Sequence, residues 1–228
     1  MRSQKENLQV LYEDNHIIII NKRIGDIVQG DKTGDIPLSE IVKQYIAKKY
    51  QKKGNVFLGV VHRLDRPTSG IIIFARTSKA LERLNKMLRD KLIQKTYWAI
   101  VKNKPAENSG TLIHYLKKNP KNNKSTVFNK EAEGSKKAVL HYCLTKDLDN
   151  YYLLEIDLET GRHHQIRAQL AAIKCPIKGD LKYGFNRSNK DGGISLHARE
   201  IKFIHPVSEK AIHIVAETPA DAIWNSCL

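Results

Sequence analysis

Cysteine is scarce in this chain of 228 residues, which contains only Cys143, Cys175 and Cys227. An odd number of cysteines without Cys-x-x-Cys spacing excludes a disulfide framework and a zinc ribbon. Scattered thiols are typical of a reducing compartment, so we expect the protein in the cytoplasm. The longest purely aliphatic run, Ile17–Ile20, is far too short to cross a membrane, and the polar first residues lack the apolar core of a secretion signal.

Acidic residues are also few, because 24 aspartates and glutamates face 39 lysines and arginines, for a net charge of +15. A balance this basic indicates a polyanionic partner, most often a nucleic acid. The alternative is that a lysine-rich composition inflates the charge without any functional meaning.

Several motifs are missing. The chain has no internal repeat, no dinucleotide-binding fingerprint and no Gly-Lys-Ser/Thr ending of a phosphate-binding loop. His163 and His164 are adjacent, so on a helix they point in different directions and lack the i,i+4 spacing of paired metal ligands. We therefore expect no metal site, although a metal-dependent nuclease or phosphoesterase remains a rival hypothesis.

The apolar pattern predicts more strands than helices, and most strands follow one another without a helical crossover. This order favours an α+β fold with a mainly antiparallel sheet, and we expect one domain over residues 1–228. A lysine- and asparagine-rich stretch, 117–137, predicts a solvated loop, with a hairpin or a phosphate-contacting arm as alternatives. The expected strands cover 8–12, 16–21, 56–62, 70–75, 96–101, 138–145, 152–158, 196–204 and 211–216, and the expected helices cover 39–49, 78–92 and 165–173.

The most informative segment is the loop expected over 63–69, which follows His62 and joins two apolar strands. It carries Asp65 between Arg63 and Arg66. Loops on a rigid scaffold are common places for catalytic groups, and neighbouring cations favour an ionised carboxylate. Such a carboxylate can act as a nucleophile or an electrostatic stabiliser. The alternative is a structural aspartate that caps a turn and pairs with an arginine.

Two further segments carry candidate residues. Residues 160–167 predict a turn out of a strand into a helix, where backbone N–H groups and basic side chains together favour an anion. Arg167 on that helix could reach an acidic group at the rim of the core or remain solvated. Tyr97 and Trp98 face opposite sides of a strand, and an aromatic ring in a cleft can stack on a nucleobase with about 1–3 kcal/mol. Core packing is the more common outcome for a strand tyrosine.

Taken together, these segments resemble the RluA family of pseudouridine synthases. The His-Arg-Leu-Asp-x-x-Thr-Ser-Gly pattern at 62–70 matches without a gap, and the supporting motifs occur in the family's order. They are a first hairpin at 11–22, Lys95-Thr96-Tyr97, the arginine motif at 161–167, Gly179-Asp180, Tyr183-Gly184 and Leu196-His197-Ala198. The chain departs from the family at Arg23, where proline is usual, and at His163, Ala168 and Gln169. The departures put only loop shape and local packing in doubt.

The resemblance implies the pseudouridine synthase fold and the isomerisation of a uridine within ribosomal or transfer RNA, without cofactor or metal. It implies a monomer that binds neither DNA nor a membrane, and a chain without the RNA-binding S4 domain of some relatives. A non-catalytic RNA-binding or chaperone protein of the same fold is the alternative. The implied catalytic residues are Asp65, its partner Arg167, and Tyr97 beside the flipped uracil. The implied RNA-binding residues are Arg63, which enters the RNA stack, and His62, Arg66, Arg162 and Gln165.

Overall fold

The computed structural model describes residues 2–31 and 33–228. The chain forms two compact units, one of residues 1–94 and 198–219 and the other of residues 95–197 and 220–228. Strands outnumber helices in both units, and the pairings within each unit given below are antiparallel. The predicted α+β class with a mainly antiparallel sheet is therefore confirmed. Among the described residues no helix is long and apolar enough to span a membrane.

The first unit is built around two completely buried strands. Ile17–Lys22 (β2) pairs antiparallel with Val10–Glu13 (β1) on one side and with Ser69–Ala75 (β4) on the other. Side chains on both faces are covered, which explains why β2 and β4 appear in the sequence as continuous apolar runs rather than as alternating patterns. The remaining strands are Gly59–Val60 (β3), which pairs with β4, and Leu196–Ile204 (β10), which pairs with Ala211–Val215 (β11).

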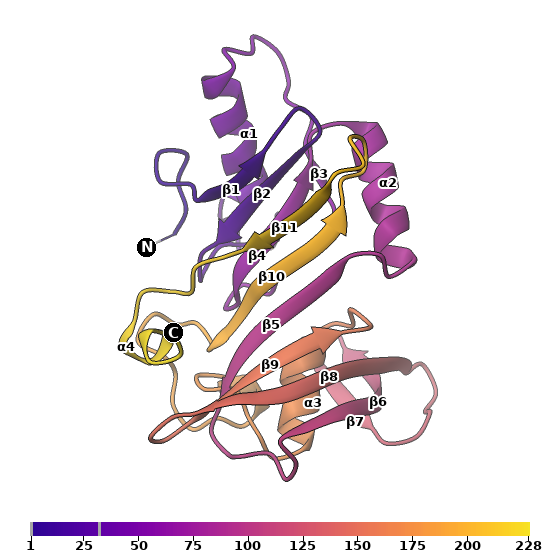
Figure 1. Cartoon of the computed structure of the whole chain (residues 1–228), viewed down its shortest axis with the longest axis vertical. Helices are drawn as coiled ribbons and strands as arrows, with labels where there is room; N and C mark the ends of the chain where they lie inside the picture. Colours follow the sequence, from indigo (N-terminus) through magenta and orange to yellow (C-terminus); the bar gives the residue numbers. More distant parts are fainter. Residues whose placement is uncertain (1, 32) are drawn as a thin grey trace. The chain divides into compact units, whose positions relative to one another are not determined.

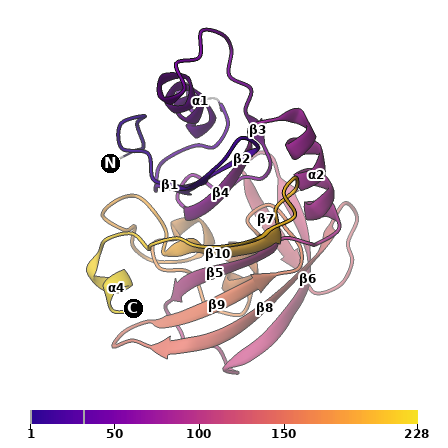
Figure 2. The same cartoon turned by 45° about the horizontal axis from the view of Figure 1, so that its top comes forward.

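Two helices of twelve residues complete this unit, Leu38–Lys49 (α1) and Ser78–Arg89 (α2). In Figures 1 and 2, α1 lies beside β1 and β2. Helix α2 begins after Thr77, whose hydroxyl oxygen accepts a hydrogen bond from the backbone of Ala80 at 3.2 Å. That bond satisfies one of the free N–H groups of the first turn, as expected for an N-cap threonine.

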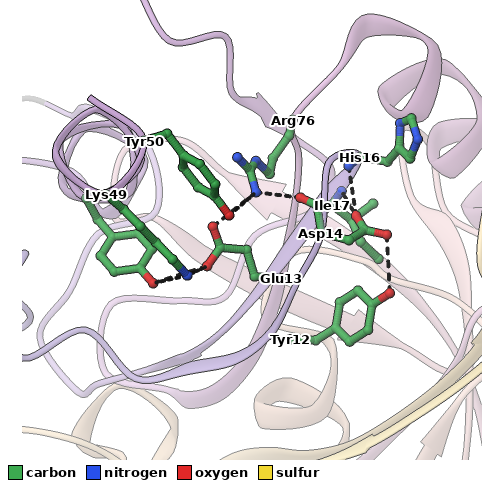
Figure 3. Close-up of polar contacts among 9 residues, drawn as sticks. Tyr12, Glu13, Asp14, His16, Ile17, Lys49, Tyr50 and Arg76 are labelled. Atoms are coloured by element: carbon green, nitrogen blue, oxygen red, sulfur yellow. Dashed lines mark hydrogen bonds and ion pairs between the residues drawn. The ribbon is translucent and has the colours of Figure 1, made fainter. Parts of the chain in front are cut away.

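A buried carboxylate fixes α1 to the first hairpin (Figure 3). Glu13, at the end of β1, accepts hydrogen bonds from Lys49 at 2.6 Å, from Arg76 at 3.0 Å and from the Tyr45 hydroxyl at 3.1 Å. Burial by itself raises the pKa of Glu13, but the hydrogen bonds from Lys49, Tyr50 and Tyr45 outweigh it and hold the pKa below its ordinary value. The charged form of Glu13 therefore joins the end of α1 to the residue that follows β4.

Asp14 closes the turn between β1 and β2 (Figure 3). One of its carboxylate oxygens accepts hydrogen bonds from the backbone N–H groups of His16 and Ile17, both at 2.8 Å. This is the local side-chain to backbone bonding that makes aspartate frequent in turns. The turn therefore places β2 in register before the chain enters the core.

The second unit is a five-stranded antiparallel arrangement in the order β5-β9-β8-β6-β7. Ala168 of the helix Gln165–Ala172 (α3) packs against Leu116 and Ala138 of two neighbouring strands. A 3-10 turn, Leu181–Tyr183, and a short helix near the C-terminus, Ala222–Asn225 (α4), complete the unit. The strands are Gln94–Val101 (β5), Ser109–Asn119 (β6), Lys124–Phe128 (β7), Lys136–Asp147 (β8) and Tyr152–Leu158 (β9).

The structure differs from the sequence predictions at four points. The expected buried strand over 56–62 is wrong, because only Gly59 and Val60 pair with β4 and the Phe57 side chain is 48% exposed. The stretch 117–137 is not a solvated loop throughout, because β6 and β7 form the hairpin that was the alternative. Strand β6 was not expected, because its side chains alternate only between exposed and half-buried along most of its length. The helix expected over 78–92 ends earlier, at Arg89.

Gly70, the second residue of β4, has a φ of +111°, and a Cβ there would lie 2.5 Å from the backbone nitrogen of Ala198. We expect Gly70→Ala to lower the free energy of unfolding by at least about 2 kcal/mol, because both the backbone angle and the close approach exclude a methyl group. Urea unfolding measures the loss. Gly54→Ala is the matched control, since a Cβ at Gly54 meets nothing within 4 Å. Equal stability of the two variants would contradict the prediction.

Candidate functional site

The loop between β3 and β4 presents the candidate catalytic residues of the first unit. Its end is a tight turn in which the backbone N–H of Thr68 donates to the carbonyl of Asp65 at 3.0 Å. Leu64 and Thr68 are buried, Asp65 is half-buried and Arg63 is exposed. Buried side chains on either side of Asp65 therefore anchor the loop while Arg63 points into solvent.

A buried lysine anchors this loop by hydrogen bonds to backbone carbonyl groups. The ammonium group of Lys22, at the end of β2, donates to the carbonyl oxygens of Thr68 at 2.7 Å, Arg23 at 3.0 Å and Arg66 at 3.2 Å. The Arg66 carbonyl also accepts from the backbone N–H of Gly25 at 2.9 Å. The residue is 1% exposed, so three carbonyl groups replace the water that a lysine normally binds.

The charge of Lys22 is tuned by burial and by two carboxylates. Loss of solvation lowers its pKa from 10.5 to about 8, while the negative charges of Asp26 and Asp65 act in the opposite direction. The ammonium is therefore close enough to Asp65 for their charges to interact. In the sequence, Lys22 belongs only to a hairpin motif, and its place as a charged residue at the end of an apolar strand is the signal for this contact.

The other candidates in this loop already have partners within the first unit. Arg66 forms an ion pair with Asp35 at 2.5 Å and donates to the Thr33 hydroxyl at 2.8 Å. The ring nitrogen Nε2 of His62 accepts the backbone N–H of Ile73 at 3.1 Å. These contacts fix both ends of the loop, and the exposed Arg63 is the candidate that presents its side chain to solvent.

Arg167, in the second unit, reaches a buried acidic group as one of the two sequence interpretations predicted. Its guanidinium binds both carboxylate oxygens of Asp180, with Nε at 2.7 Å and Nη2 at 2.9 Å. The Tyr183 ring lies 5.1 Å from the guanidinium carbon, and burial raises the pKa of its hydroxyl. Asp180 appeared in the sequence only as part of a glycine-containing turn, so its pairing with Arg167 was missed.

The expectation that His163 and His164, just before α3, point in different directions is wrong. Their rings stack with centroids 3.8 Å apart, because His164 has a left-handed backbone with a φ of 53° and the helix begins only at Gln165. His163 and the Ser125 hydroxyl are 2.9 Å apart, and His164 lies 3.0 Å from the Tyr183 hydroxyl. Both rings therefore belong to the hydrogen-bonded support of the helix start. Among the described residues no group of histidine, cysteine and acidic side chains is arranged to hold a metal ion.

Gln165 closes the turn that precedes α3. Its side-chain oxygen accepts hydrogen bonds from the Thr160 hydroxyl at 2.7 Å and from the Arg162 backbone at 2.9 Å, and its nitrogen donates to the Val139 carbonyl at 3.0 Å. The Arg162 side chain is exposed and donates to the carbonyl of Lys137 at 2.9 Å. Gln165 is buried and shapes the turn, whereas Arg162 lies on its surface.

Tyr97 and Trp98 of β5 have different environments, as their opposite directions predicted. Tyr97 is buried at 7% exposure and lies opposite Ile156 of β9. Trp98 is half-buried, and its indole N–H donates to Glu155 at 3.1 Å. Tyr97 therefore lies on the buried side of β5 and Trp98 on the more exposed side.

We expect Lys22→Met to lower the free energy of unfolding by roughly 1–3 kcal/mol at neutral pH, because three buried carbonyl groups lose their donor. The stability difference should depend on pH. Between pH 8 and 10.5 the unfolded lysine keeps a proton that the folded one has lost, so the wild type gains stability as the pH rises. The gain is at most about 1.4 kcal/mol per pH unit and is absent in Lys22→Met. Urea unfolding at several pH values measures it, and parallel stability curves for the two proteins would refute it.

We expect Asp180→Ala to destabilise the protein by about 3–5 kcal/mol, because it leaves the Arg167 guanidinium buried without a counter-charge. Asp147→Ala is the control, since it removes an exposed carboxylate that pairs with Lys104 at 3.0 Å. An exposed ion pair is worth at most about 1 kcal/mol. Guanidinium unfolding compares the two variants, and similar losses would show that the buried pair has no special weight.

The comparisons with known proteins agree on one family. The family model for RNA pseudouridylate synthase matches residues 16–172. A Synechocystis protein described as an uncharacterized RNA pseudouridine synthase is 34% identical, over 96% of this chain and 68% of that protein. The ribosomal large subunit pseudouridine synthase D of Xylella fastidiosa is 32% identical, over 94% of this chain and 67% of its own length.

Among solved structures, human RNA pseudouridylate synthase domain containing 4 shares the fold. It superposes with a TM-score of 0.79 over 95% of this chain and 90% of its own, at 22% sequence identity. The predicted pseudouridine synthase fold is thereby confirmed. The chain belongs to the RNA pseudouridylate synthase family and is an isomerase that acts on RNA.

Proposed function

We propose that this enzyme flips a specific uridine out of ribosomal RNA and converts it to pseudouridine with Asp65 as the catalytic group. The observation that carries the proposal is the anchored loop, in which Lys22 and the Asp65–Thr68 turn support one half-buried carboxylate beside one exposed arginine. A flipped base needs such a preformed site because unstacking costs a few kcal/mol. The bond between N1 and C1′ of the ribose breaks, the base rotates and C5 joins C1′. C5 then loses its proton and N1 gains one, so no atom is gained or lost overall.

The proposal gives different tasks to the other candidate residues. Arg63 enters the RNA stack where the uridine has left, and exposed Arg162 contacts phosphate. The Tyr97 ring packs against the flipped uracil. The family resemblance assigns Arg167 to the support of the Asp65 charge.

Three of the predicted RNA-binding residues contribute mainly by holding other parts of the site in place. His62 and Arg66 hold the ends of the Asp65 loop, and Gln165 shapes the turn that carries Arg162. Their polar groups bond to backbone, hydroxyl or carboxylate partners within the protein, which supports an indirect contribution to RNA binding. We propose that the enzyme works as a monomer in the cytoplasm, a reducing compartment that fits its scattered thiols.

Ribosomal RNA is the first substrate to test. The similar Xylella protein, and one from Rickettsia felis that is 32% identical over 92% of this chain, are named as ribosomal large subunit pseudouridine synthases. Transfer RNA remains the second candidate, because the sequence motifs do not distinguish the two substrates.

We expect a carbodiimide map of pseudouridines to lose at least one ribosomal RNA site in cells that lack the gene. The same site should be missing in cells that carry only Asp65→Ala, and the purified variant should be at least about a thousandfold slower, as when a reacting group is removed. Asp149→Ala, a change at an exposed turn aspartate, should restore the site. A site retained in Asp65→Ala cells would refute the catalytic assignment, and a site lost only from transfer RNA would replace the proposed substrate.

A further inference from the structure

The second unit contains a pocket that none of the proposed catalytic residues lines. Its volume is about 510 Å³, which is in the range of pockets that hold small molecules. The chain builds it from the two residues after β5, the residue before β9, Pro176 and Lys178, and the segment 184–189. The side chains that matter for recognition are those of Lys102, Tyr151, Lys178, Phe185, Arg187 and Asn189.

Two aromatic rings form a surface in this pocket. The centroids of Tyr151 and Phe185 are 6.5 Å apart, with an angle of 31° between the ring planes. Both side chains are half-buried, and Tyr151 packs against a buried cluster that contains Ile100 and Leu153. Partly exposed rings on a rigid support are what proteins use to stack unpaired bases of RNA.

The cations in the pocket lie close to the same rings. The ammonium groups of Lys102 and Lys178 lie 5.3 Å and 5.9 Å from the Tyr151 ring centroid. Arg187 adds a third positive charge, and no aspartate or glutamate is among the described residues that line the pocket. Positive charge beside an aromatic surface complements a nucleotide, which presents a phosphate and a flat base together.

An asparagine holds one of these cations in place. The Asn189 side-chain oxygen accepts from Lys178 at 2.6 Å, and its nitrogen donates to the Ser195 hydroxyl at 3.3 Å. A Cβ at Gly179 would lie 2.7 Å from Asn189, so the asparagine packs directly on the backbone there. Lys178 is thereby fixed before any ligand binds, which lowers the entropy cost of binding.

We propose that this pocket is a second RNA-binding site, which holds one unpaired nucleotide of the substrate with its base against Tyr151 and Phe185. Lys102, Lys178 and Arg187 bind the phosphates of that nucleotide and its neighbour. The site selects RNA in which a single-stranded nucleotide accompanies the target uridine, and it contributes affinity rather than chemistry. This inference rests on the RNA substrate of the proposed function but not on the identity of the catalytic group.

Direct binding tests the two halves of the pocket separately. The probe is a fluorescein-labelled single-stranded RNA oligonucleotide, and its anisotropy is followed at several salt concentrations. We expect Tyr151→Leu/Phe185→Ala to weaken binding about tenfold with an unchanged salt dependence, because base stacking is uncharged. Lys102→Ala/Arg187→Ala should also weaken binding and reduce the slope of log Kd against log salt by about 1.4, the value for two phosphate contacts on a single strand.

The matched control is Lys52→Ala/Lys53→Ala, which removes two exposed lysines from the first unit. It should leave both the affinity and the salt slope close to those of the wild type. Unchanged affinity in the ring variant, or an equal loss in the control, would overturn the proposal.

Photochemical cross-linking of the wild type avoids any question of variant folding. RNA that contains 5-bromouridine should cross-link to a peptide that includes Tyr151 or Phe185, and cross-linked peptides without either residue would overturn the proposal. If uridine monophosphate blocked this cross-link without weakening RNA binding, the pocket would be a site for free nucleotides and the proposal would be wrong. If the enzyme cross-linked to RNA at this pocket but formed no pseudouridine, the proposed binding site would be supported and only the proposed chemistry would be refuted.

Discussion

A buried ammonium group determines the shape of the loop that carries Asp65. Lys22 ends a strand whose residues are all buried, and its charge is met by backbone carbonyls of the loop rather than by water. Removal of a charge from water is costly unless the surroundings supply hydrogen bonds, so the loop conformation and the position of Lys22 require each other. Because β2 lies between β1 and β4, Lys22 anchors the loop to the centre of the unit.

The second unit also contains a buried cation, but here a carboxylate rather than backbone carbonyl groups binds it. Arg167 and Asp180 form a buried, two-bonded ion pair, and Tyr183 joins that pair to Ser125 and the histidines before α3. Removing one partner of such a pair is far more damaging than removing an exposed pair, because the remaining charge stays buried. In both units the segment that carries a candidate residue is therefore held by a satisfied buried charge.

The high positive charge of the chain has two distinct uses. Arg66, Arg76 and Arg167 form ion pairs with carboxylates of the protein itself. The cations that the proposals assign to RNA are the exposed Arg63, Arg162, Lys102 and Arg187 and the half-buried Lys178. The net charge of +15 indicates a polyanionic partner, but it does not tell which cations meet it. The distinction depends on which carboxylates the fold brings beside each arginine.

The sequence by itself determined the family, the α+β class and most of the strands, because motif spacing and apolar periodicity are local properties of the chain. It also marked Asp65 and Arg167 as the residues to examine. Only the tertiary structure decided that Lys22 supports the Asp65 loop, that Asp180 binds Arg167 and that Phe57 is exposed rather than in a buried strand. The same holds for the pairing of Tyr151 with Phe185. These contacts join residues that are distant in sequence, and the exposure of Phe57 depends on which other segments cover it. No local sequence pattern encodes such contacts or such exposure.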